Sequence, residues 1–158
     1  MRTAAALAAF LLLGGTSGAQ PAQTLHKAYA RVTTIVNFTT VYVGESLLAC
    51  AAAGAISEAE AEEQFQSYRQ RNAALDARVE AWSRETELKL RGRDAERAAR
   101  EDAREAGLSA VAGASLHAQR EVGAAPDARA FCAARLAAIN AGAFDLSRNA
   151  ELLTLLEP

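Results

Sequence analysis

The chain has two cysteines, whose chemistry depends on whether the cellular compartment is oxidising or reducing. Cys50 lies in the stretch ESLLACAAAG and Cys132 in RAFCAARL, and the 158 residues contain no other cysteine. An oxidising compartment favours pairing, and closing a loop this long contributes on the order of 4 kcal/mol by the chain-entropy estimate. A redox-active pair is disfavoured because no Cys-x-x-Cys motif is present. We therefore predict a structural disulfide between Cys50 and Cys132, with two buried free thiols or intermolecular pairing as the alternatives.

The two histidines, His26 and His117, give little support for a metal or haem site. Neither lies in a Glu-x-x-His or His-Glu-x-x-His motif, which would place metal ligands on one helical face. Covalent haem attachment needs Cys-x-x-Cys-His, and Met1 is the only methionine, so the mature chain has no methionine ligand. We expect no metal and no cofactor, and a partly buried, hydrogen-bonded His117 beside an apolar stripe. A haem held by His117 alone is the alternative.

Glu45 is the carboxylate of most interest for catalysis, because it interrupts an otherwise apolar stretch. A perturbed pKa of Glu45 or His117 in a cleft would indicate an enzyme, so these two residues form a speculative site. The competing interpretation is that Gly44, Glu45 and Ser46 simply face solvent. No Gly-x-Ser-x-Gly elbow is present, and the acids within residues 60–63 suit the first turns of a helix. We predict no catalytic residue.

The amino terminus, MRTAAALAAFLLLGGTSGAQ, has the three parts of a secretory signal peptide. Arg2 supplies the positive charge, residues 4–13 form the apolar region, and small residues at 17–19 give a cleavage site near Ala19. No later segment has the roughly 18 uninterrupted apolar residues of a membrane helix. Abundant alanine and a preference for arginine over lysine indicate a GC-rich bacterial genome. We therefore expect a bacterial periplasmic or secreted protein without membrane insertion.

Size and charge restrict the remaining possibilities. Removal of residues 1–19 leaves roughly 139 residues, which suits a single domain over residues 20–158. The formal net charge of −2 becomes −3 without Arg2, and acids and bases are interspersed along the chain. Nothing in this pattern indicates a nucleic-acid partner.

Apolar residues recur at helical spacing through most of the chain. The spacing predicts a first helix over residues 24–53, although VTTIVNFTTVYV is also rich in strand-forming residues, because no second strand-like run is available to pair with it. Gly54 suits a helix end, and Ser57 with Glu60 forms a capping box that begins a second helix. The inward face of that helix should carry bulky residues, with Asn72 as an exception.

A break is expected near residues 90–93, with Asp94 helping to begin a third helix that ends at residues 123–126. Its first half has an alanine-rich apolar side, and a thicker apolar stripe follows, made of Leu108, Val111, Ala112 and Leu116, with Ala118 as a further candidate. Asp127 then begins a fourth helix that Gly142 ends, and Asn149 caps a short amphipathic helix at the carboxyl end.

These elements predict an all-α fold, an antiparallel four-helix bundle with a short C-terminal fifth helix. The disulfide would tie the first helix to the fourth, because Cys50 ends one and Cys132 begins the other. A non-enzymatic protein-interaction or binding module with another periplasmic protein as partner fits the missing catalytic and cofactor motifs. The alternatives are a carrier of a small apolar ligand or haem in a bundle cavity, and an unrecognised enzyme.

Overall fold

The computed structural model describes residues 19–91 and 94–157, and this part of the chain is all-α. The expected signal peptide therefore falls almost entirely outside the described residues. Within them there is no strand, and the stretch from Val32 to Val43 is helical throughout. The elements are α1 (Ala19–Ala52), α2 (Glu58–Leu90), α3 (Asp94–Ala124), α4 (Ala128–Asn140), the 3₁₀ helix η1 (Leu146–Arg148) and α5 (Ala150–Leu155).

Short polar side chains begin the helices where the sequence predicted. The Ser57 hydroxyl accepts a hydrogen bond from the Glu60 backbone N–H, and the Glu60 carboxylate accepts one from the Ser57 N–H at 2.7 Å. Asp127 caps α4 and Asn149 caps α5 in the same way, through their side-chain oxygens. Gly54 ends the turn after α1 with a φ of +66°, a conformation that favours glycine.

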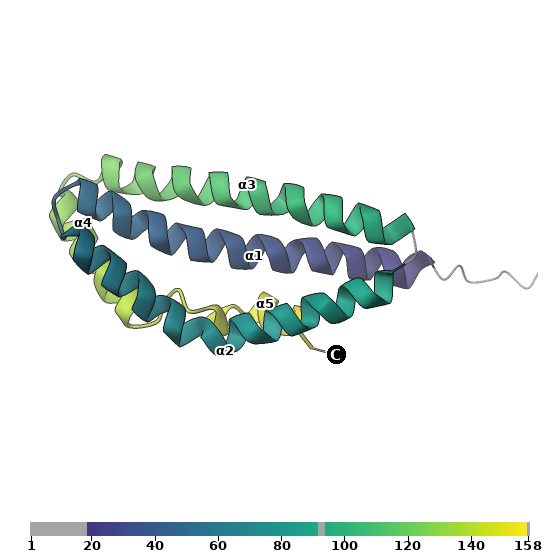
Figure 1. The fold of residues 1–158 in the computed structure, drawn as a ribbon. Helices are drawn as coiled ribbons and strands as arrows, with labels where there is room; N and C mark the ends of the chain where they lie inside the picture. Colours follow the sequence, from purple (N-terminus) through teal and green to yellow (C-terminus); the bar gives the residue numbers. More distant parts are fainter. Residues whose placement is uncertain (1–18, 92–93, 158) are drawn as a thin grey trace, which may run out of the picture.

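α1 lies at the centre of the molecule, between α2 and α3 in Figure 1. α3 runs in the same direction as α1, and α2 runs in the opposite direction. The segment from α4 to α5 returns along α2, and its leucines enter the core between α1 and α2. One core cluster joins α1 and α2 to α5 through Val32, Ile35, Leu152 and Leu156, with Trp82 packed against it. The predicted fourth helix is thus short, and η1 and α5 continue its path.

Asn72, the expected exception on the inward face of α2, holds this C-terminal segment in place. Its side-chain oxygen accepts a hydrogen bond from the Leu146 N–H at 2.7 Å, and its nitrogen donates to the Tyr68 carbonyl. Arg71, one residue earlier, donates to the Ile139 carbonyl at 2.7 Å and lies 3.4 Å from Asp145. Buried amides and charges are stable only when they are paired in this way.

α3 turns its smallest side chains toward α1. Its buried face is formed by small residues and one valine, namely Ala99, Ala103, Gly107, Ala110, Ala114, Ala118 and Val122. A Cβ atom added at Gly107 would lie 2.9 Å from the Asn37 side-chain nitrogen, so the two helices approach closely there. The thicker stripe that the sequence singled out lies on the other side: Leu108, Val111 and Leu116 are 63%, 41% and 50% exposed.

Gly44 and Ser46 are turned inward, which corrects the interpretation that this stretch of α1 faces solvent. Ser46 is 2% exposed, and a Cβ atom at Gly44 would lie 3.2 Å from the Phe65 ring. Glu45, between them, is partly buried. The helical period explains the difference, because consecutive residues on a helix point in directions about 100° apart.

α1 is long and apolar enough to cross a bilayer over residues 24–52 by length and composition alone. About a third (33%) of the most apolar part of this helix is buried inside the molecule, and its buried apolar residues pack against α2, α3, α4 and α5.

Candidate functional site

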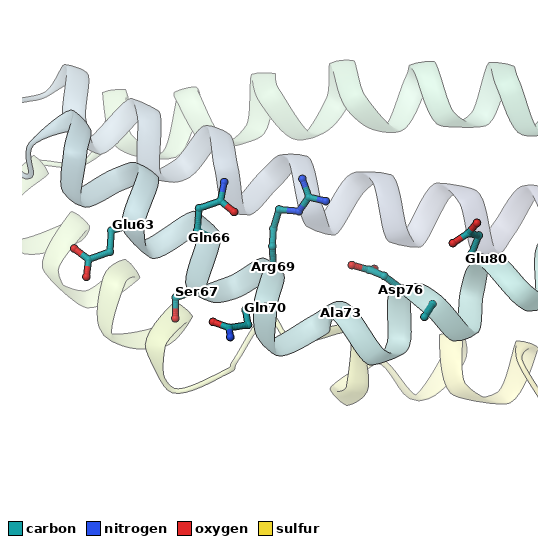
Figure 2. A pocket seen from close by; sticks show the side chains of 9 residues that line it. Glu63, Gln66, Ser67, Arg69, Gln70, Ala73, Asp76 and Glu80 are labelled. Carbon is teal, nitrogen blue, oxygen red and sulfur yellow. The ribbon is translucent and has the colours of Figure 1, made fainter.

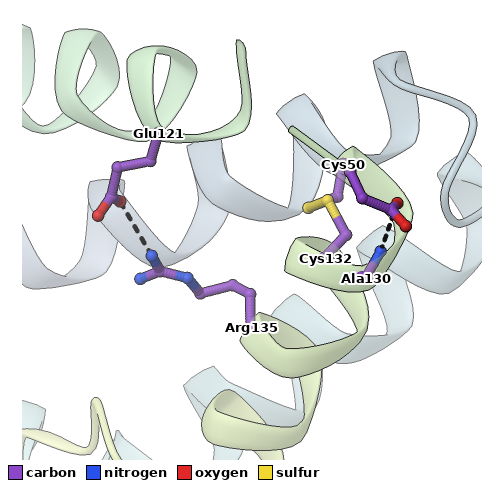
Figure 3. Close-up of a disulfide and its surroundings, with 6 residues drawn as sticks. Cys50, Glu121, Ala130, Cys132 and Arg135 are labelled. Carbon is purple, nitrogen blue, oxygen red and sulfur yellow. Dashed lines mark hydrogen bonds and ion pairs between the residues drawn. A yellow bond between two sulfur atoms is a disulfide. The ribbon is translucent and has the colours of Figure 1, made fainter. Parts of the chain in front are cut away.

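The disulfide lies at the end of the molecule where α1 ends and α4 begins (Figure 3). Cys50 and Cys132 are bonded with a Cα–Cα distance of 5.7 Å, and both are almost fully buried. The predicted pairing is therefore confirmed. Val122 at the end of α3 packs against the pair, so three helices meet here.

One helical turn from the disulfide, Arg135 of α4 is almost enclosed by partners from α1 and α3. Its guanidinium donates to Glu121 at 3.0 Å and to the Tyr42 hydroxyl, which in turn donates to Glu121. The Arg135 Cζ atom lies 5.1 Å from the ring centres of Tyr42 and Phe131 and 5.3 Å from that of Phe144. Cation–π contacts of this kind strengthen as solvent is excluded, and only 13% of the Arg135 side chain is exposed.

Burial raises the pKa of Tyr42 to about 12, and the hydrogen bond to Glu121 adds to this effect. The phenol therefore stays protonated at neutral pH. Its oxygen accepts from Arg135 and its proton is held by Glu121, so the polar atoms of this cluster are engaged with one another. We call Tyr42, Glu121 and Arg135 the three-helix cluster, because each residue comes from a different helix.

The structure brings His117 to the edge of the three-helix cluster but leaves Glu45 outside it. The His117 ring stacks on Tyr42 with 5.4 Å between ring centres, and Nε2 lies 3.8 Å from a Glu121 carboxylate oxygen. The His117 side chain is 55% exposed, more than the sequence suggested. Glu45 is partly buried on α1 and does not take part in the hydrogen bonds of the cluster.

The described part of the chain holds no group of three or more His, Cys, Asp or Glu side chains arranged to bind a metal ion. His26 instead hydrogen-bonds Asp102, which joins the start of α1 to α3.

An open groove follows one flank of α2, and all the residues that line it come from this one helix (Figure 2). It has a volume of about 960 Å³ and is lined by Glu63, Gln66, Ser67, Arg69, Gln70, Ala73, Asp76, Ala77 and Glu80. Asp76 extends in the direction of Arg69, with Ala73 between them in the helix. Burial raises the pKa of Asp76, and the positive charge of Arg69 opposes that rise. We call this the α2 groove.

A second depression, the Trp82 notch, has an apolar lining. It lies between the start of α1, the end of α2 and α5, with a volume of about 620 Å³. Leu25, Trp82, Leu155 and Leu156 form much of its wall, and Arg78, Glu85 and Lys89 also line it. No histidine lines the notch.

No protein-family model matches the chain, and neither a curated protein nor a solved structure is similar enough to match it.

Sequence reasoning missed both the three-helix cluster and the α2 groove. Arg135 stands in an alanine-rich helix one turn after Phe131, and a charged residue on such a slim helix is the one signal that could have singled it out. The partners on α1 and α3 are 93 and 14 residues away along the chain, a separation that carries no local pattern. The α2 groove looks in sequence like any solvated helical face.

Proposed function

We propose that this chain is an exported, non-enzymatic binding module that holds a polar segment of another periplasmic protein in the α2 groove. The observation that carries this proposal is the lining of the groove. Three acids, one arginine and two glutamines line its length, a set suited to hydrogen bonds and ion pairs with a mixed-charge polypeptide surface. Because acids outnumber the single arginine, the bound segment should carry a net positive charge.

The three-helix cluster favours a structural role over catalysis. A catalytic acid or base must reach a substrate proton, whereas the polar atoms of Tyr42 and Arg135 already form hydrogen bonds with each other and with Glu121. Neither the α2 groove nor the Trp82 notch is lined by residues of this cluster.

Export is supported by the signal-like amino terminus and by the Cys50–Cys132 disulfide, which persists in an oxidising compartment. For the architecture, we propose a single domain over residues 20–158 in which α4, η1 and α5 together take the place of the fourth antiparallel helix. The hydrogen bonds from Asn72 and Arg71 to this segment support that arrangement.

The test is capture of a partner by the oxidised, processed protein from a periplasmic extract of its own cells. Ala73→Trp blocks the middle of the α2 groove, and Ala133→Trp places the same bulk at an exposed position on α4. We expect the Ala133→Trp variant to retain a specific protein that the Ala73→Trp variant loses. Equal capture by both variants would remove the groove from the proposal.

Native mass spectrometry of the protein isolated from its own periplasm addresses the function directly. A bound protein lost on denaturation supports the interaction module, and a small bound molecule instead supports a carrier.

The Trp82 notch supports a carrier of a small apolar ligand as the second candidate function. Trp82 is the only tryptophan in the chain and is part of the notch wall, so its fluorescence reports directly on occupancy. A carrier should bind an apolar dye with a saturable change in Trp82 emission, and Ala28→Phe should abolish that binding by filling the notch while Trp82 remains the only tryptophan. Dye binding that persists in this variant would argue against the notch as the binding site.

A further inference from the structure

The outward face of α3 carries more of the exposed large apolar residues than any other described helix. Five large apolar residues are strongly exposed in the described chain, and α3 carries three of them: Leu108, Val111 and Leu116. α3 packs against α1 through its opposite, alanine-rich face. An exposed apolar patch of this kind in a folded protein marks an interaction surface.

The pattern on this face is symmetric about its centre. Leu108, Ala112 and Leu116 are four residues apart, which places them in one line along the helix. The small, exposed Ala112 lies midway between the two leucines. If a second α3 crosses in the opposite direction at Ala112, each Leu108 meets the Leu116 of the other copy. This is the self-complementarity that a twofold interface requires, where residue i contacts j and j contacts i.

The charges on the same face also favour an antiparallel pair. The exposed Glu101 and Glu105 precede the leucines, and the exposed Gln119 and Arg120 follow them, while the exposed Arg104 points about 100° around the helix from Glu105. A parallel pair would set each Glu105 against its own copy, and like charges placed together oppose association. An antiparallel pair centred on Ala112 instead sets Glu105 beside the Gln119 and Arg120 of the second copy.

We infer that this chain forms a twofold-symmetric dimer through antiparallel α3 helices that cross at Ala112. The second copy covers Leu108 and Leu116, and Glu105 and Arg120 form an ion pair between copies on each side of the crossing. The inference goes beyond the proposed function and does not depend on it, because the α2 groove lies on a different helix and stays open in the dimer.

Sedimentation equilibrium of the oxidised, processed protein tests the dimer and its register. We expect Leu108→Arg to abolish dimers, and Glu105→Arg or Arg120→Glu alone to weaken association about tenfold by placing like charges together. The double variant Glu105→Arg/Arg120→Glu should restore association to within about threefold of the wild type, since the pair is then reversed. Failure of the double variant to recover would overturn the antiparallel register.

Cross-linking tests the position of the crossing. Ala112→Cys places a thiol where the two copies meet, and Ala124→Cys places one at the exposed end of the same helix. A short thiol cross-linker should join Ala112→Cys chains at least about tenfold faster than Ala124→Cys chains, because only the first pair is held close together. Equal cross-linking rates would place the crossing elsewhere and overturn the inferred crossing at Ala112.

Two further outcomes would also overturn the inference. One is a wild-type protein that stays monomeric at every concentration. The other is a wild-type protein that is monomeric and captures a protein which its Leu108→Arg variant no longer captures. That result would assign the outward face of α3 to a different partner. Retention of the α2-groove partner by the Leu108→Arg variant would leave the proposed function intact in either case.

Discussion

α2 and α3 pack against the same helix with opposite distributions of side-chain size. α2 turns Tyr68, Leu75, Val79 and Trp82 toward the core and presents a polar groove to solvent. α3 turns alanine and glycine toward α1 and exposes its leucines. The area that a side chain removes from water increases with its size. α2 therefore stabilises the fold mainly through buried apolar area, and α3 mainly through the close packing of its backbone against α1. The difference shows that the bulkiest stripe of a helix need not be its inward one.

The largest effect should come from removing bulk on the inward face of α2. Leu90 is 1% exposed and packs against Ala99, so Leu90→Ala should lower the free energy of unfolding by about 2–5 kcal/mol, through lost burial and the cavity left behind. Leu88 is on the same helix and is 57% exposed, so Leu88→Ala should change the free energy of unfolding by no more than about 0.5 kcal/mol. Urea denaturation followed by circular dichroism measures both. Similar losses in the two variants would contradict the inward and outward assignment of α2.

The opposite change should be harmful on α3. Ala114 is fully buried against α1, and Ala114→Leu should cost about 1–3 kcal/mol because the close approach of the helices leaves no room for the added atoms. Ala124→Leu, at an exposed position on the same helix, is the matched control and should be nearly neutral. The same denaturation experiment compares them. A neutral Ala114→Leu would mean that α3 packs less tightly than its alanines indicate.

The three-helix cluster supplies α3 with a polar attachment to α1 and α4. Arg135→Met keeps much of the side-chain volume but leaves Glu121 without its cation, and we expect a loss of about 1–3 kcal/mol. Arg129→Met removes an exposed arginine from the same helix and should have little effect. Calorimetry on both variants measures the difference. Equal melting temperatures would show that the alanine face alone holds α3 in place.

The smallest effect concerns alkaline pH. Burial raises the pKa of both Tyr42, which faces α3, and Tyr68, on the inward face of α2, to about 12. An unfolded tyrosine loses its proton near pH 10, so deprotonation favours the unfolded state between about pH 10 and 12. Below pH 10 this contribution is complete, and it is lost as the pH rises through 12.

The expected result is a free energy of unfolding that falls between about pH 10 and 12, with a smaller fall in Tyr42→Phe, measured by urea denaturation across that range. Tyrosinate absorbance should increase in the same interval. A fall of the same size in Tyr42→Phe would show that Tyr42 is already solvated in the folded protein.

Local patterns predicted the helices well. Helix ends depend on hydrogen bonds or on a backbone conformation within a few residues of each end. The positions that mark them are Ser57 with Glu60, Gly54, Asp127 and Asn149. The expected inward face of α2 is also confirmed, because bulky residues at helical spacing have few ways to leave water. The end of α2 at Leu90 and the start of α3 at Asp94 match the break expected between them.

On α3 the expected alanine-rich side of the first half is buried at Ala99 and Ala103, but the thicker stripe of the second half is exposed, because hydrophobicity does not determine which face is inward when two faces are both apolar. Leu108 and Leu116 give the stronger pattern, yet the alanine face allows the backbone of α3 to approach α1 at Gly107. The choice depends on the shape of α1, which carries Thr33, Asn37 and Phe38 toward α3. That shape is absent from the sequence of α3.

The sequence by itself determined the helical segments, their caps and the identity of the one possible intramolecular disulfide, because each depends on local hydrogen bonds, helical period or simple counting of thiols. Only the tertiary structure decided which face of α3 is buried and that Tyr42, Glu121 and Arg135 meet. Those outcomes depend on contacts between side chains far apart in the chain, where the fit of one surface to another outweighs the preference of any single residue.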